Sequence, residues 1–112
     1  MKKILFITIA CACSLSLFAQ TAFPIVSGEQ SAPIYIDQND HWLVEKAAAL
    51  LQSDIEKVTG KKTGLSHALP TAAKNIIVIG SLDKSALIKQ LVTTKRLHVD
   101  SITEKWEAFQ LQ

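Results

Sequence analysis

The sequence has little cysteine, glycine or proline. Its two cysteines, Cys11 and Cys13, both lie in the first twenty residues, and the chain of 112 residues has four glycines and three prolines. A disulfide scaffold and a collagen-like or low-complexity chain are therefore excluded. The composition, 48% hydrophobic and 20% charged, is typical of a globular protein. This length allows one domain, which excludes a multidomain enzyme.

The chain also lacks a large excess of charge. It carries 12 Lys and Arg against 10 Asp and Glu, and two of the lysines, Lys2 and Lys3, lie at the N-terminus. The rest of the chain is therefore balanced and has no basic stripe. Because phosphate backbones require such a stripe, nucleic-acid binding is not expected.

The one long apolar run lies at the N-terminus. Residues 4–18 carry no charge, two lysines precede them, and Ala19 is a small residue at their end. Secretory signal peptides have this order, whereas a membrane-spanning helix needs about 20 apolar residues. We predict a signal peptide over residues 1–19, cleavage after Ala19, and an exported chain of residues 20–112 in the periplasm or outside the cell, with no membrane contact after cleavage. An uncleaved anchor or a buried helix is the alternative.

The first half of the mature chain changes from a β-like to a helical pattern. Residues 23–26 and 34–36 are β-branched and aromatic runs, and they predict two short strands separated by a turn. Apolar residues then recur every three or four positions, which predicts a helix over residues 40–60. Asp40 is expected to cap this helix, and Gly60 to end it in the left-handed conformation.

The second half repeats the alternation. Residues 65–69 predict an edge strand, and residues 76–79, apolar on both faces, predict a central strand buried on both sides. A second helix follows, with Ser81 or Asp83 as its cap and an apolar face between residues 86 and 92. The expected fold class is α/β, a small mixed β-sheet with two main helices packed on it, held together without disulfides.

The C-terminal segment fits two structures. Ser101 and Glu104 have the spacing of a capping box, and Trp106 and Phe109 fit one face of a helix. Trp106 and its neighbours suit a strand equally well. The sequence stops at Gln112 inside this apolar run, so we expect the chain to be a truncated piece of something longer.

Motifs for nucleotides and metals are incomplete. Gly80 to Ser85 lies between a predicted strand and a predicted helix, as a phosphate-binding loop does, but the glycine spacing of that motif is missing. The histidines form no His-x-x-x-His pair and have no cysteine beside them in the mature chain, so no metal site is predicted. These histidines are His41, His67 and His98. We predict no cofactor.

No catalytic residue is assigned. Asp37 and Asp40 are the only close carboxylates that resemble the acid and base of a glycosidase, but nothing predicts the apolar pocket that would raise one pKa. A Ser/His/Asp triad lacks the Gly-x-Ser-x-Gly elbow. Three aromatic residues, Tyr35, Trp42 and Trp106, are candidate contacts to sugar rings or to a neighbouring domain, and packing in the core or a domain interface is favoured.

One set of residues resembles a known family. Its clearest parts are the Val-Thr-Gly helix end at 58–60, the Ile-Ile-Val-Ile-Gly strand at 76–80 and the Trp-Glu-Ala-Phe segment at 106–109. Other matching residues are Ile36, Asp37, Asp40, Val44, Ala47, Ala48, Leu51, Asp54, Ile55, Ile88 and Leu91. Over essentially all of the mature chain, the pattern resembles the N-terminus of family 115 glycoside hydrolases, which are exported xylan α-1,2-glucuronidases. Their small N-terminal α/β domain is similar to the domain before the catalytic barrel in family 67 glucuronidases and family 20 hexosaminidases.

The resemblance implies a strand at residues 106–109 and a function. The chain would be the non-catalytic N-terminal accessory domain of a secreted enzyme that removes glucuronic acid or its 4-O-methyl form from xylan, truncated before the catalytic barrel and inactive alone. Its partners would be that missing barrel and, as a candidate, xylan. A free-standing exported module that binds carbohydrate or another protein is the alternative, and a small independent hydrolase has the least support.

Overall fold

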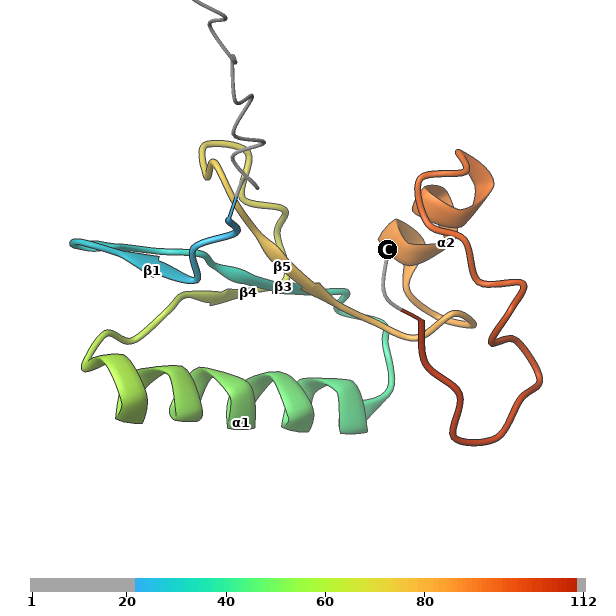
Figure 1. The fold of residues 1–112 in the computed structure, drawn as a ribbon, viewed down its shortest axis with the longest axis horizontal. Helices are drawn as coiled ribbons and strands as arrows, with labels where there is room; N and C mark the ends of the chain where they lie inside the picture. Colours follow the sequence, from blue (N-terminus) through green and yellow to red (C-terminus); the bar gives the residue numbers. More distant parts are fainter. Residues whose placement is uncertain (1–21, 111–112) are drawn as a thin grey trace, which may run out of the picture.

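Residues 22–110 are described by the computed structural model, so the predicted signal peptide and the cleavage after Ala19 lie outside the described residues. The described chain is a small mixed α/β domain with two helices and two small sheets (Figure 1). In chain order the elements are β1 (Val26–Ser27), β2 (Gln30–Ser31), β3 (Ile34–Ile36), α1 (Trp42–Thr59), β4 (Leu65–Ser66), β5 (Ile77–Ile79) and α2 (Ala86–Thr93).

The main sheet has three parallel strands in the order β4-β3-β5. Ile34 pairs with Leu65 on one side and with Ile77 on the other, so β3 is the central strand. The prediction that residues 76–79 form the central strand is therefore wrong. Those residues pair on one side only and are half-buried, whereas Ile34 and Ile36 are 0% and 1% exposed.

The second sheet is a small hairpin that the sequence pattern did not predict. β1 and β2 pair antiparallel, with Gly28 in the turn at a φ of 59°. The strand predicted at residues 23–26 begins only at Val26, and the segment expected to be a turn carries the second strand. The chain therefore has two separate sheets and not one mixed sheet.

Helix α1 lies along one face of the main sheet (Figure 1). Its Ala48 and Ile55 are buried against Ile34 and Ile36 and form the core with them. The predicted end is confirmed, since Gly60 has a φ of 70° and donates its N–H to the Glu56 carbonyl at 2.8 Å. The core is thus one apolar stripe of α1 on one face of β3.

The start of α1 differs from the prediction. Its N-cap is His41, which makes no side-chain capping bond, so Asp40 is not the cap. The Asp40 carboxylate accepts a hydrogen bond from the His41 N–H and two from Ser81, which follows β5 at the same end of the sheet. Asp40 therefore joins two parts of the chain and does not complete the helix.

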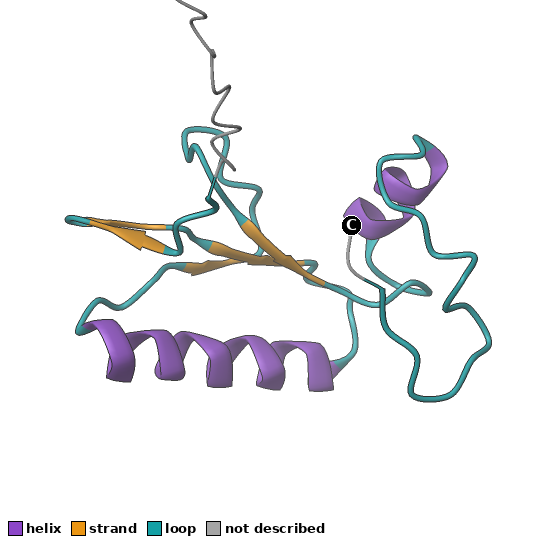
Figure 2. Cartoon of the chain, viewed as in Figure 1, coloured by secondary structure: helices purple, strands orange, loops and turns teal. Residues whose placement is uncertain are grey.

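Helix α2 does not pack on the sheet face as expected. Figure 2 shows it beyond the end of the sheet, while α1 runs beneath the strands. Its N-cap is Ser85, whose hydroxyl accepts the Ile88 N–H at 3.3 Å, so neither Ser81 nor Asp83 caps it. After α2, residues 94–110 form turns, bends and irregular segments, and both alternatives for the C-terminal segment, helix and strand, are absent from its described part, residues 101–110.

Candidate functional site

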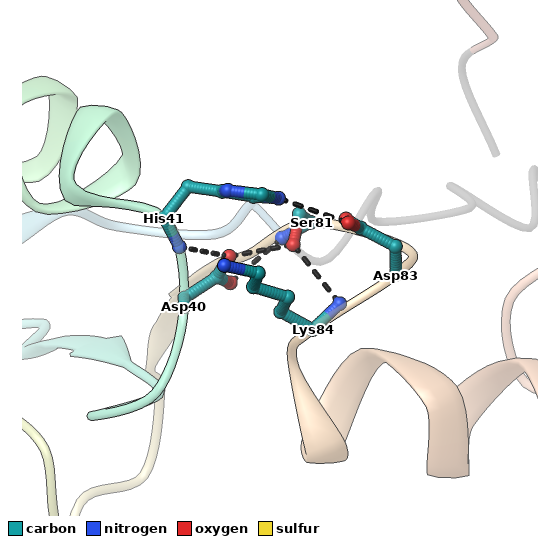
Figure 3. A network of polar contacts seen from close by, with 5 residues as sticks. All are labelled: Asp40, His41, Ser81, Asp83 and Lys84. Atoms are coloured by element: carbon teal, nitrogen blue, oxygen red, sulfur yellow. Dashed lines mark hydrogen bonds and ion pairs between the residues drawn. The ribbon is translucent and has the colours of Figure 1, made fainter.

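Polar side chains meet where β3 and β5 end. Asp40 and His41 follow β3, and Ser81 and Asp83 follow β5 (Figure 3). We call these four residues the strand-end cluster. In open α/β sheets, ligands bind outside the carboxyl ends of strands, where the connections leave in opposite directions. The chain passes from β3 to β4 on one side, β5 lies on the other side, and no strand follows β5 within residues 22–110, so the cluster lies at the carboxyl ends of two neighbouring parallel strands.

Asp40 and Ser81 form the inner part of the cluster. The two Asp40 carboxylate oxygens accept the Ser81 N–H at 2.8 Å and the Ser81 hydroxyl at 2.5 Å, and one also accepts the His41 N–H at 2.7 Å. The Ser81 oxygen in turn accepts the Lys84 N–H at 3.2 Å. These bonds fasten the loop after β5 to the loop after β3.

Asp83 and His41 form the outer part. The His41 Nε2 and Asp83 Oδ2 atoms are 2.9 Å apart, and the two side chains are 44% and 67% exposed. Beside this pair, Asp37 accepts the Asn39 N–H at 3.1 Å and the Ala86 N–H, the first of α2, at 3.0 Å. Asp37 therefore holds the start of α2 against the end of β3.

The two aspartates of the cluster are held in the ionised form. Partial burial acts to raise the pKa of Asp40, but hydrogen bonds from the Ser81 hydroxyl, the Ser81 N–H and the His41 N–H together lower it below its usual value. The hydrogen bond from His41, followed by the nearby Ser81 hydroxyl, lowers the pKa of Asp83. A glycosidase acid needs a raised pKa, so neither carboxyl has the property of a proton donor near neutral pH.

The cluster does not form a nucleophilic triad or a phosphate site. The Ser81 hydroxyl donates a hydrogen bond to Asp40, and the His41 ring is hydrogen-bonded to Asp83. The serine and the histidine therefore belong to two separate pairs. A phosphate loop needs free backbone donors, but the N–H groups of Ser81 and Lys84 are already bonded within the protein. The geometry is that of a structural link between two loops.

The three candidate aromatic residues do not form one surface: Tyr35 is half-buried, and the two tryptophans are exposed. Tyr35 is half-buried on β3, and because side chains alternate along a strand, it lies on the face opposite α1. The pKa of Tyr35 is raised, mainly by burial and in addition by the negative charge of Asp37. Trp42, the first residue of α1, is 78% exposed, and Trp106 is 89% exposed. Neither tryptophan belongs to the core, and Tyr35 and Trp42 do not share a surface.

Trp42 stands at an open hollow beside the strand-end cluster. The hollow has a volume of about 480 Å³, and its lining is mostly apolar: His41, Trp42, Leu43, Val44, Ala47 and Ile79. The hollow thus lies between the start of α1 and β5. No local sequence pattern predicts this hollow, because it depends on β5 being at the edge of the sheet.

The histidines do not gather into a metal site. His41 contacts Asp83, and the His67 Nε2 lies 4.0 Å from a Glu45 carboxylate oxygen. Within residues 22–110 no group of three or more histidine, cysteine or acidic side chains is placed to hold a metal ion. Over the same residues, no helix has both the length and the apolar character needed to cross a membrane.

We expect Asp40→Asn to destabilise the fold by about 1–3 kcal/mol at pH 7, since hydrogen bonds to charged groups are worth about that much. Because folding lowers the pKa of Asp40 below the unfolded value of about 3.9, the stabilisation is complete well above that value and is lost as the pH falls through the folded pKa. Urea unfolding at pH 7, 5, 3 and 2 should therefore show a difference between wild type and variant that shrinks toward pH 2.

Asp54→Asn is the matched control for this prediction. Asp54 is an exposed aspartate that forms an ion pair with Lys57, with the Lys57 Nζ and Asp54 Oδ1 atoms 3.6 Å apart. Because exposed pairs contribute about 0–1 kcal/mol, the control should unfold close to the wild-type urea midpoint at every pH. An Asp40→Asn variant that behaves like this control would show that the Asp40 bonds do not stabilise the fold.

The chain was compared with models of known protein families and with curated proteins, and none of them matches it.

Proposed function

We propose that this chain is the N-terminal accessory domain of a secreted glycoside hydrolase that removes glucuronic acid or its 4-O-methyl form from xylan, and that it is itself non-catalytic. The catalytic barrel would be supplied by other residues of the parent enzyme. Support comes from the resemblance of residues 58–60, 76–80 and 106–109 to the start of family 115 enzymes, and from the α/β architecture of the domain.

The observation that carries the non-catalytic role is the use of the carboxylates. Asp37 holds the start of α2, Asp40 bonds to Ser81, and Asp83 pairs with His41. A glycosidase needs one carboxyl that is protonated near neutral pH and one that is free to face a sugar ring. The pKa values of Asp40 and Asp83 are both lowered, so the cluster supplies no such acid.

The exposed apolar side chains support a partner domain. Trp42, Trp106 and Phe109 are all largely exposed, at 78%, 89% and 83%. Of these, Trp42 lies in an apolar surface shared with Leu43 and Ala47, and contiguous exposed apolar surface marks sites where another protein docks. An accessory domain that packs against a barrel would need such surface.

We predict that the chain alone releases no uronic acid from glucuronoxylan. The measurement is a reducing-sugar and uronic-acid assay on the purified chain, with a complete family 115 enzyme as the positive control. The same chain is then added to a family 115 enzyme from which the N-terminal domain has been deleted. We expect it to bind that barrel and to raise its thermal midpoint, whereas turnover by the chain alone, or no binding to the barrel, would contradict the proposal.

A free-standing exported module that binds carbohydrate or another protein is the second candidate. The exposure of Trp42 and Trp106 favours it, because indole faces offer flat apolar area to a sugar ring. Titration of the chain with xylo-oligosaccharides, followed by tryptophan fluorescence, separates the two candidates. A saturable change lost in Trp42→Ala or Trp106→Ala would favour the carbohydrate module over the accessory domain.

A further inference from the structure

The two edges of the main sheet are built differently. The β4 edge is two residues long, and directly after it the Ser66 hydroxyl and the Ala68 backbone exchange hydrogen bonds that turn the chain, with Pro70 following. Short strands and prolines are the devices by which proteins prevent pairing at an edge. The β5 edge carries Ile77, Val78 and Ile79 and has no charge, proline or bulge within the strand.

The outer side of β5 offers a backbone donor and acceptor. Ile77 donates its N–H to the Pro33 carbonyl at 2.9 Å, toward β3. In a parallel ladder, alternate residues form their backbone hydrogen bonds with the same neighbouring strand. The backbone N–H and C=O groups of Ile77 and Ile79 therefore point toward β3, and those of Val78 point outward. An unguarded apolar edge with free backbone groups is a template for another strand.

Helix α1 carries a second apolar stripe on the same side. Leu43, Ala47, Leu50 and Val58 are exposed and recur every three, four or eight positions, so they form one flank of the helix. This flank lies on the β5 side, because Leu43 and Ala47 line the hollow together with Ile79. The opposite flank faces β4, where Gln52 donates to the Thr63 carbonyl at 2.6 Å.

We propose that the β5 edge is the interface for a second copy of this chain. A two-fold axis that is perpendicular to the sheet and passes midway between Val78 and its copy pairs β5 antiparallel with the second β5 and joins the two sheets into one of six strands. Such an interface must be self-complementary. The apolar, uncharged edge satisfies this condition, and the same axis would place both α1 helices under the same face, with their apolar flanks directed toward each other across it.

Val78 is the residue that tests this pairing. In the proposed register it lies opposite its own copy as a hydrogen-bonded pair, with Cα atoms about 5.5 Å apart. That separation is within the range that a disulfide spans. We expect Val78→Cys to give a covalent dimer under mild oxidation. The chain of residues 20–112 is used, and because both cysteines of the sequence, Cys11 and Cys13, precede it, the new thiol is its only one.

Val92→Cys is the matched control, since Val92 is equally half-buried but lies on α2, away from this edge. It should cross-link at least tenfold less than Val78→Cys. By light scattering after gel filtration, we expect the wild-type chain to be a dimer at micromolar concentration and Val78→Lys, which places a charge at the edge, to be a monomer with an unchanged circular dichroism spectrum.

Several outcomes would overturn the dimer. A wild-type chain that stays monomeric at about a hundred micromolar has no such interface, and equal cross-linking by the two cysteine variants would place the contact elsewhere. An association that Val78→Lys leaves intact would also exclude the β5 edge. The dimer does not depend on the proposed function, because it requires only this chain, so it can fail while binding to a family 115 barrel succeeds.

Discussion

The Gly80→Ala variant is expected to lose about 3 kcal/mol of unfolding free energy, near the upper end of what overpacking of a core site costs. A Cβ added at Gly80 would lie 2.7 Å from the Ser85 Cβ, 2.8 Å from the Ser85 Oγ and 2.9 Å from the Ile88 Cγ1. Neither neighbour can move freely, because Ser85 is fully buried and caps α2, while Ile88 is the buried residue of that helix. The added methyl would push α2 away from the end of β5.

Gly64→Ala is the control for this variant. A Cβ at Gly64 would meet the Pro33 Cβ at 3.8 Å, which is an ordinary contact, so its urea midpoint should stay close to that of the wild type. Urea unfolding followed by circular dichroism measures both variants. Since small domains have about 5–15 kcal/mol of total stability, the Gly80 variant should unfold at a clearly lower urea concentration. Equal midpoints for the two variants would mean that α2 does not pack closely on Gly80.

The second large loss is expected for Ile34→Ala, at about 2–5 kcal/mol, the usual cost of emptying a buried isoleucine site. Ile34 is 0% exposed and lies in the core with Ile36, Ala48 and Ile55. It also pairs with both neighbouring strands, so the sheet cannot close around the cavity without losing its register.

The control for Ile34 is Val58→Ala on the outer flank of α1. Val58 is 85% exposed, so its truncation should change the free energy of unfolding by less than about 0.5 kcal/mol in a monomer. Denaturation at low protein concentration keeps any association of the chain out of the comparison. If Ile34→Ala were as stable as Val58→Ala, β3 would not be the centre of the core.

Local patterns predicted the helices and strands well where the chain itself decides the structure. The α1 stripe, its end at Gly60 and the strand at residues 34–36 follow from side-chain period and from the freedom of glycine at positive φ. The caps were predicted less well. Asp40 has the right residue type and position for a cap, but a partner from a distant loop, Ser81, binds its carboxylate instead.

Strand order was the property that local patterns could not supply. Residues 76–79 are apolar enough for a central strand, but β3 has that position because two segments far along the chain both pair with it. The same order brings His41 next to Asp83 and Asp40 next to Ser81. In the sequence, each of these residues does lie shortly after a predicted strand. That position is the signal from which the strand-end cluster could have been predicted.

The position of β3 in the middle of the sheet has a kinetic consequence. The hairpin of β1 and β2 joins neighbouring residues and can form early, but β3 must wait for β4 beyond α1 and for β5 later still. Loop closure of this kind makes non-local pairing slow compared with helix formation. An emerging chain would therefore keep its core strand without a partner strand until most of the chain had been made.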